Sequence, residues 1–121
     1  MSLCLFSGAA VLLTLAAPEI TLSWRHSVEH VEWREDWRAV PGGLRLIRAA
    51  VRGSGAGMEP GEGARIEDGW WVWAPDGPEV PELWLASSGA TGAGWTLCSA
   101  GECHEVGKAP GQALRLAPCG E

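Results

Sequence analysis

Two histidines and a glutamate lie close together in the segment His26-Ser27-Val28-Glu29-His30. The order H-x-x-E-H matches the zinc signature of inverted metallopeptidases, in which two histidines one helical turn apart bind the metal beside a general base. The flanking residues instead alternate as in a β-strand, which would hold the two histidines about 13 Å apart at roughly 3.3 Å per residue. We therefore predict no metal site and no catalytic residue here. A metal-dependent or other hydrolase that uses His26, Glu29 and His30 is the alternative interpretation.

Two ionisable residues, His26 and Glu35, occupy the apolar positions of neighbouring predicted strands. A charged group in such a place needs a partner, or its pKa shifts towards the neutral form. Two interpretations stay open: a structural cluster with Glu29 that fixes the strand register, and a contact with a bound ligand. Ser27 is not the nucleophile of a triad, because adjacent residues of a strand face opposite sides. The candidate binding residues are therefore His26, Ser27, Glu29 and Glu35.

A glycine-rich stretch, Gly53-Ser54-Gly55-Ala56-Gly57, resembles a phosphate-binding loop at first sight. It lacks the Lys-Ser/Thr pair of a P-loop, and Met58 stands where a dinucleotide fingerprint has glycine. We therefore predict no cofactor and interpret the stretch as a turn or bulge in which backbones approach closely. Its backbone N–H groups could still bind a small anion, so Gly53, Gly55 and Gly57 complete the candidate binding site.

Cys98 and Cys103 flank four turn-like residues, a spacing that places two sulfurs opposite each other in a hairpin. We predict a disulfide between them, formed in an oxidising compartment. Cys119 is then left over, and a bond from it to either of the other two stays open because connectivity cannot be deduced from sequence. A zinc site is the rival interpretation, but the second ligand pair at zinc spacing is missing beside His104.

The first 17 residues carry no charged side chain, and Leu3–Leu15 is almost entirely apolar. We interpret residues 1–17 as a signal peptide or N-terminal hydrophobic segment, with a cleavage site at Ala16 and Ala17. The stretch is shorter than the roughly 20 residues of a membrane span, and its missing basic residues leave a buried first strand or helix as the alternative. Residues 18–121 are then one β domain, exported to the periplasm or another extracytoplasmic space.

The rest of the chain alternates between short strand patterns and turn residues, which is typical of a small all-β domain. We predict an antiparallel sandwich or barrel of about seven to nine short strands. The expected strands are Ile20–Ser27, Val31–Trp37, Leu44–Val51, Arg65–Glu67, Trp70–Trp73, Leu83–Ala86, Trp95–Cys98, Cys103–Val106 and Leu114–Leu116.

The composition adds two constraints on partners and packing. The chain has 8 Trp but 1 Phe and no Tyr, so indoles must make the large apolar contacts, and each buried indole N–H needs an acceptor. The formal charge of −6 repels phosphate backbones and anionic lipids, so nucleic acid is not an expected partner.

Three stretches together resemble the domain of unknown function 1850 family. They are Trp24–Glu29 with Trp33 and Glu35 following, Gly53–Met58, and Ala64–Trp70. The resemblance implies a small exported protein, often encoded beside tripartite ATP-independent transporters of the TAXI type. His30 and the three C-terminal cysteines are not part of the pattern. We therefore expect a non-catalytic accessory or binding protein of a solute transport system, whose partner is a transporter component or its solute-binding protein.

Overall fold

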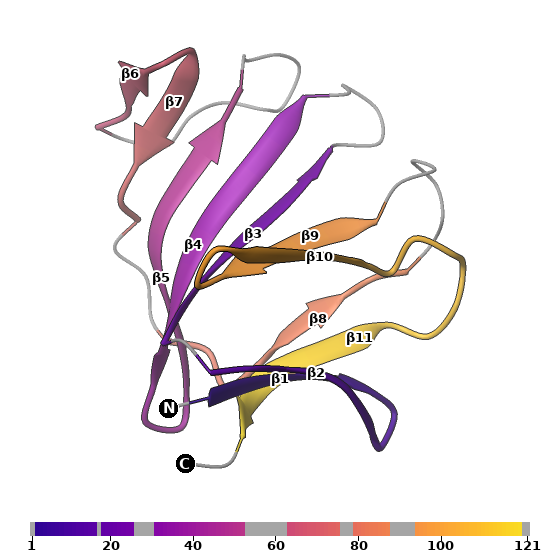
Figure 1. Ribbon diagram of the computed structural model, residues 1–121. Coiled ribbons are helices and arrows are strands. Elements are labelled where there is room, and N and C mark those ends of the chain that lie inside the picture. Colours follow the sequence, from indigo (N-terminus) through magenta and orange to yellow (C-terminus); the bar gives the residue numbers. More distant parts are fainter. Residues whose placement is uncertain are drawn as a thin grey trace.

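The computed structural model of this protein describes residues 2–16, 18–25, 31–52, 63–75, 79–87 and 94–119. They form two antiparallel sheets that face each other as an open sandwich and do not close into a barrel (Figure 1). The predicted all-β fold is confirmed. Figure 1 shows the two sheets diverging from the end at which both termini lie.

The smaller sheet is four-stranded, with the order β2-β1-β11-β8. Its strands are β1 (Ser2–Ser7), β2 (Ala10–Leu15), β8 (Leu83–Leu85) and β11 (Leu114–Cys119). The larger sheet is seven-stranded, with the order β10-β9-β3-β4-β5-β7-β6. Its strands are β3 (Glu19–Arg25), β4 (Glu32–Val40), β5 (Gly43–Val51), β6 (Arg65–Glu67), β7 (Trp70–Trp73), β9 (Trp95–Ser99) and β10 (Glu102–Val106). Strands β3 to β11 lie at the predicted places, whereas β1 and β2 are additional.

Two hairpins of the larger sheet turn through the same pair of backbone conformations. Asp68 and Gly69 join β6 to β7 with φ of 52° and 84°, and Ala100 and Gly101 join β9 to β10 with the same two values. Positive φ at both central residues defines the two-residue turn whose twist matches that of the flanking strands. The predicted Asp-Gly hairpin therefore forms as expected.

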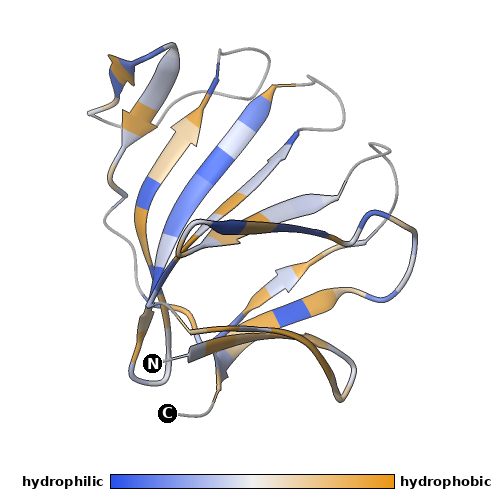
Figure 2. Ribbon diagram, viewed as in Figure 1, coloured by the Kyte–Doolittle hydropathy of each residue, from blue (hydrophilic) through white to orange (hydrophobic). Residues whose placement is uncertain are grey.

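The N-terminal apolar segment is part of the sandwich in this structure. Strand β1 lies between β2 and β11, and its side chains Leu3 and Leu5 are completely buried. Figure 2 draws β1 and β2 mostly in the hydrophobic colours, in keeping with their lack of charge. A structure of the whole chain does not test whether the segment is removed, so the signal peptide stays a prediction. Among the described residues, no helix has the length and apolarity needed to cross a membrane.

The core fills the end where the sheets are closest. The larger sheet contributes buried side chains such as Ile20, Leu22 and Leu97, and the smaller sheet contributes Leu5 and Leu116. Full burial of such a side chain stabilises the fold by about 1.5–3 kcal/mol relative to leaving it exposed. This cluster fixes how the two sheets face each other and therefore which parts of the larger sheet stay uncovered.

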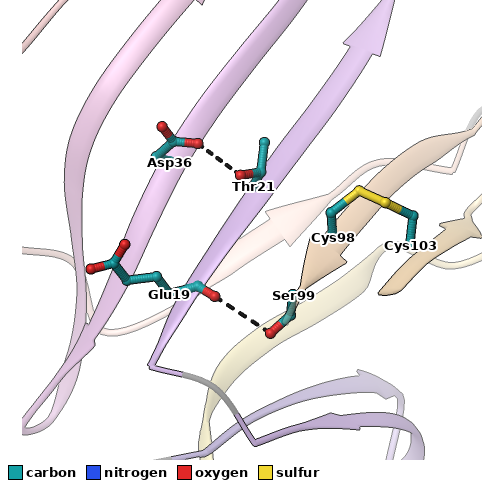
Figure 3. Close-up of a disulfide and its surroundings, with 6 residues drawn as sticks. All are labelled: Glu19, Thr21, Asp36, Cys98, Ser99 and Cys103. Atoms are coloured by element: carbon teal, nitrogen blue, oxygen red, sulfur yellow. Dashed lines mark hydrogen bonds between the residues drawn. A yellow bond between two sulfur atoms is a disulfide. The ribbon is translucent and has the colours of Figure 1, made fainter. Parts of the chain in front are cut away.

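Two disulfides cross-link the fold, and one of them differs from the predicted state of Cys119. The predicted Cys98–Cys103 bond is present, and the two residues are direct neighbours in the β9–β10 register with Cα atoms 4.0 Å apart (Figure 3). Cys119, which was expected to be left over, is bonded to Cys4. The expectation was wrong because Cys4, which lies in the predicted signal peptide, is present in this structure and is the partner of Cys119. Cys4 and Cys119 belong to adjacent strands, β1 and β11, so the fold brings the two ends of the chain together.

Side-chain hydrogen bonds tie the disulfide hairpin to the middle of the larger sheet. The Ser99 hydroxyl lies 3.4 Å from the Glu19 carbonyl oxygen, to which it donates (Figure 3). One strand further along, the Thr21 hydroxyl donates to the Asp36 carboxylate at 2.8 Å. These bonds fix β9, β3 and β4 as neighbours, and those strands carry most of the site described next.

Candidate functional site

Of the predicted site residues, the structure describes Glu35. The other six lie outside the described residues: His26, Ser27, Glu29, Gly53, Gly55 and Gly57. His30 also lies outside them, so the convergence of His26, Glu29 and Glu35 stays a prediction. The described residues include the strand ends from which these segments start and the surroundings of Glu35.

The ends of β3 and β5 bring the two candidate segments, residues 26–30 and 53–62, to one end of the larger sheet. Arg25, which precedes residues 26–30, pairs with Glu32 at the start of β4. Arg52, which precedes residues 53–62, donates its backbone N–H to the Glu32 carbonyl at 2.9 Å. Both segments thus begin beside the same residue of β4. This is the arrangement of strand ends that the predicted convergence requires.

Glu35 lies in the inner face of the larger sheet, three residue pairs inward from that end. The register pairs it with Leu22 of β3 and with Ala49 of β5, both of which are buried. Because side chains two residues apart on a strand share a face, Trp33 and Trp37 flank Glu35 on the same side. The carboxylate is therefore surrounded by apolar and indole side chains.

Burial raises the pKa of Glu35 above its ordinary value near 4.5, and a hydrogen bond from Trp37 partly opposes this. The Trp37 indole Nε1 donates to Glu35 Oε1 at 2.9 Å. None of the ion pairs among the described residues includes Glu35. The ionised carboxylate has one neutral donor and no cation within this part of the chain, which is costly for a charge away from water.

Four half-buried indoles meet beside Glu35, and we call them the tryptophan cluster: Trp24, Trp33, Trp73 and Trp95. Trp24 and Trp33 stack with centroids 6.2 Å apart, and Trp95 tilts against Trp24 at 5.0 Å. The Trp73 ring meets Trp33 edge to face at 6.1 Å. The cluster crosses β9, β3, β4 and β7, in the half of the larger sheet from which the smaller sheet diverges (Figure 1).

The indole N–H groups of the cluster differ in how they are satisfied. Trp95 Nε1 donates to the Ala86 carbonyl at 2.8 Å, whereas Trp33 Nε1 is buried and has no hydrogen-bond partner among the described residues. A buried donor without an acceptor costs about 1–3 kcal/mol. Trp33 therefore brings a donor that no described residue satisfies to the same face of β4 as the Glu35 carboxylate.

This arrangement suits binding better than bond-breaking chemistry. Indole faces carry negative potential and attract a cation, and a nearby carboxylate adds an opposite charge. No group of three or more His, Cys, Asp or Glu side chains that could hold a metal ion is present in the described parts of the chain. The described side chains of the site are one carboxylate and several indoles, which can recognise a ligand by charge, stacking and hydrogen bonding.

Sequence reasoning placed Glu35 among apolar neighbours but missed the tryptophan cluster. Alternation in the sequence does put Trp24 and Trp33 on the faces of their strands that carry His26 and Glu35. Trp73 and Trp95 gave no such signal, because they arrive from β7 and β9 through pairings that only the register reveals. The unusual number of tryptophans was the available hint.

These features define a class of protein: an open β-sandwich with two disulfides and, on its inner face, a carboxylate beside a cluster of indoles. This chain belongs to the domain of unknown function 1850 family, whose model matches residues 20–106. The match runs from β3 to β10 and so includes Glu35 and the whole tryptophan cluster, while β1, β2 and β11 lie outside it. No curated protein and no solved structure matches the chain.

Proposed function

We propose that this chain is an exported, non-catalytic binding module that serves a solute transport system as an accessory protein. One observation carries the binding role: Glu35 is a half-buried carboxylate beside the tryptophan cluster, without a cation among the described residues. Export is supported by the two disulfides, which are compatible with an oxidising compartment. The transport role rests on the resemblance to a family encoded beside such transporters.

The chemistry of the site favours a ligand with a positively charged nitrogen. A substituted ammonium group gains from the negative faces of Trp24 and Trp33 and from the Glu35 carboxylate at once. An ammonium group buried at an aromatic surface is attracted by about 0.5–2 kcal/mol, and a carboxylate within reach adds to this. The ligand would be a small solute or a side chain of the solute-binding protein that delivers it.

A fluorescence titration with a pair of isosteric probes tests this proposal. Choline carries a trimethylammonium group, and 3,3-dimethylbutan-1-ol has the same shape with carbon in place of nitrogen. We expect choline to change the tryptophan fluorescence of the full chain saturably, with an affinity at least about tenfold above that of the neutral probe. Equal responses to both probes would contradict a cation site.

Two glutamine substitutions, one at Glu35 and one at Glu32, test whether the choline response depends on Glu35. The variant Glu35→Gln keeps the shape of the side chain and removes its charge, so it should lower the affinity for choline towards that of the neutral probe and leave only the contribution of the indole faces. Glu32→Gln is the matched control, because Glu32 lies on the same strand but on the opposite face. An unchanged choline response in Glu35→Gln would overturn the assigned role of Glu35.

A further inference from the structure

One row of cross-strand neighbours on the inner face of the larger sheet carries only apolar side chains. The row crosses all seven strands of that sheet, and its members are register partners except for Trp95 and Trp24, whose ring centroids are 5.0 Å apart. From β10 to β6 the row consists of Val106, Trp95, Trp24, Trp33, Val51, Trp71 and Ile66. Directly opposite residues of antiparallel strands share a face and lie close together. The row is therefore a continuous strip, which we call the apolar band.

The hydrophobic core covers only one half of the apolar band. The band residues of β10, β9 and β3 pack against the core between the two sheets, whereas those of β4, β5, β7 and β6 are neither part of the described core nor packed against it. Figure 1 draws β6 and β7 at the side of the larger sheet farthest from β8 and β11. The second half of the band therefore extends beyond the part of the sheet that the described core occupies.

Exposure along this second half rises towards the edge of the sheet. Val51 is completely buried between Trp33 and Trp71, which are both half-buried. Ile66, at the end of the band, is 61% exposed, more than any other large apolar side chain among the described residues. A contiguous apolar surface beside a few polar groups is typical of sites for small molecules.

The polar group beside the apolar band is the Glu35 carboxylate, which lies in the next row of the same face. Glu35 pairs with Ala49 and Ala49 with Trp73, so the carboxylate and that indole start from strands about 10 Å apart. Within the band, the strands of Trp33 and Ile66 are about 14 Å apart. A ligand with a charged nitrogen at Glu35 therefore has apolar surface along one direction, towards β6.

We propose that the ligand of this site is a small amphiphilic cation, which consists of a substituted ammonium group and an apolar arm of about 10–14 Å. This inference rests on the proposed cation site and adds the chemistry of the rest of the ligand. The ammonium group lies at Glu35, and the arm lies across Trp73 and Trp71 towards Ile66. The carboxylate attracts the charged end, and the apolar band removes the arm from water.

Charge complementarity favours a cationic amphiphile over an anionic one. An anionic head group beside the apolar band would meet the Glu35 carboxylate and be repelled. The Arg34 and Arg52 guanidiniums, which could attract an anion, lie over Trp70 on the opposite face of the sheet. The inner face therefore selects the sign of the head group, and the apolar band selects for the arm.

Isothermal titration calorimetry of the full, oxidised chain with a series of cations tests this inference. The probes are choline, butyltrimethylammonium and octyltrimethylammonium. From the butyl to the octyl compound we expect the affinity to rise by at least about twofold for each added methylene, since full burial of a methylene is worth about fourfold. Octane-1-sulfonate has the same tail with an anionic head, and it should bind at least about tenfold more weakly than the octyl cation.

Two variants test whether the arm lies along the apolar band. Trp71→Ala and Ile66→Ser each remove apolar area from the band beyond Glu35, and each should lower the ratio of the octyl to the butyl affinity by about threefold or more. Ile66→Ser changes an exposed side chain, so it provides the test even where Trp71→Ala loses stability. Trp84→Ala is the matched control, because Trp84 is 60% exposed on the outer face of the smaller sheet, and its ratio should equal that of the wild type.

The possible results distinguish this inference from the proposed function. Choline binding that depends on Glu35, with an octyl affinity no higher than the butyl affinity, would overturn the inference and leave the cation site in place. Octane-1-sulfonate that binds as tightly as the octyl cation would also overturn it, because the carboxylate would then have no part in selecting the ligand. An unchanged affinity ratio in both variants would show that the arm lies elsewhere. If neither choline nor the octyl cation binds, the proposed function fails and the inference fails with it.

Discussion

The carboxylate of Glu35 lies in surroundings that favour its neutral form, yet the protein retains an acid there. Its hydrogen bond from Trp37 satisfies one oxygen, and burial among apolar side chains raises its pKa. A leucine would fit the inner face of a sandwich more simply, since burial of polar groups is costly unless they are fully paired. The proposed role of Glu35 in ligand recognition would account for this cost, and a role in the stability of the fold would not.

The raised pKa of Glu35 has a measurable consequence for stability. A carboxyl group whose pKa is higher in the folded than in the unfolded state stabilises the fold when protonated, and this contribution is lost as the pH rises from about 4.5 through the folded value. The melting temperature of the wild type relative to Glu35→Gln should therefore fall as the pH increases across this window. The measurement is a series of thermal melts of both proteins from acidic to neutral pH.

A rise in the stability of the wild type relative to Glu35→Gln with increasing pH would indicate a structural role for Glu35. If the wild type gained stability over Glu35→Gln as the pH rose, the folded surroundings would favour the ionised carboxylate, as a pairing with His26 would. That result would assign Glu35 to a structural cluster, which is the interpretation that the sequence left open. Glu32→Gln controls for the general effect of removing one negative charge from β4.

At the scale of the elements, turn chemistry and alternation predicted most of the strands, but not their neighbours. The Asp68-Gly69 turn and the alternation around Trp24 fixed their local structure, because short-range backbone preferences decide both. The pairings of β9 with β3 and of β5 with β7 join distant parts of the chain, and packing decides them. The tryptophan cluster depends on these pairings, so it was not predictable from the sequence.

The N-terminal segment shows why one pattern can serve two interpretations. An uncharged apolar run such as Leu3–Leu15 suits a signal peptide, and it equally suits a strand whose inner face is buried. Ser7 and Gly8 interrupt the run, and in the structure the chain turns at Gly8 between β1 and β2. Cys4 is the residue that favours the strand, since its thiol supplies the partner that Cys119 otherwise lacks.

The two disulfides should differ in their contribution to stability. Cys4–Cys119 spans a sequence separation of 115 residues, whereas Cys98–Cys103 spans 5. In the chain-entropy model the longer loop stabilises the folded state by about 3 kcal/mol more than the shorter one. We expect the double variant Cys4→Ser, Cys119→Ser to lose more unfolding free energy in urea than Cys98→Ser, Cys103→Ser. Equal losses would show that the terminal strands do not act as a stapled unit.

At the scale of the whole molecule, the sandwich separates its charges. The chain is acidic overall, but most of its arginines lie on the outer face of the larger sheet. Two of them, Arg34 and Arg52, lie over the Trp70 ring at 4.6 Å and 5.8 Å from its centroid. The inner face therefore presents the Glu35 carboxylate away from these cations, which keeps the site acidic.

The presence or loss of the N-terminal hairpin β1–β2 decides whether the smaller sheet has four strands or two. The apolar pattern alone predicts loss of the first 16 or 17 residues, but that would remove β1 and β2 from the smaller sheet. Exposure of the buried side chains that these strands cover would cost more than an isolated surface change. Removal of residues 1–17 stays a prediction, and the mature chain would then keep β8 and β11 of the smaller sheet. Intact-mass spectrometry of the native protein, without reduction, measures both the length of the chain and its two disulfides.

Site-resolved nuclear magnetic resonance of the indole N–H groups tests the binding role most directly. Each of the 8 tryptophans contributes one indole signal, and choline should shift those of Trp24, Trp33, Trp73 and Trp95. The signals of Trp70 and Trp84, which lie on the outer faces of the two sheets, should stay in place. At a given choline concentration the shifts should be smaller in Glu35→Gln and unchanged in Glu32→Gln. Shifts confined to Trp70 or Trp84, or no shift at any choline concentration, would contradict the account.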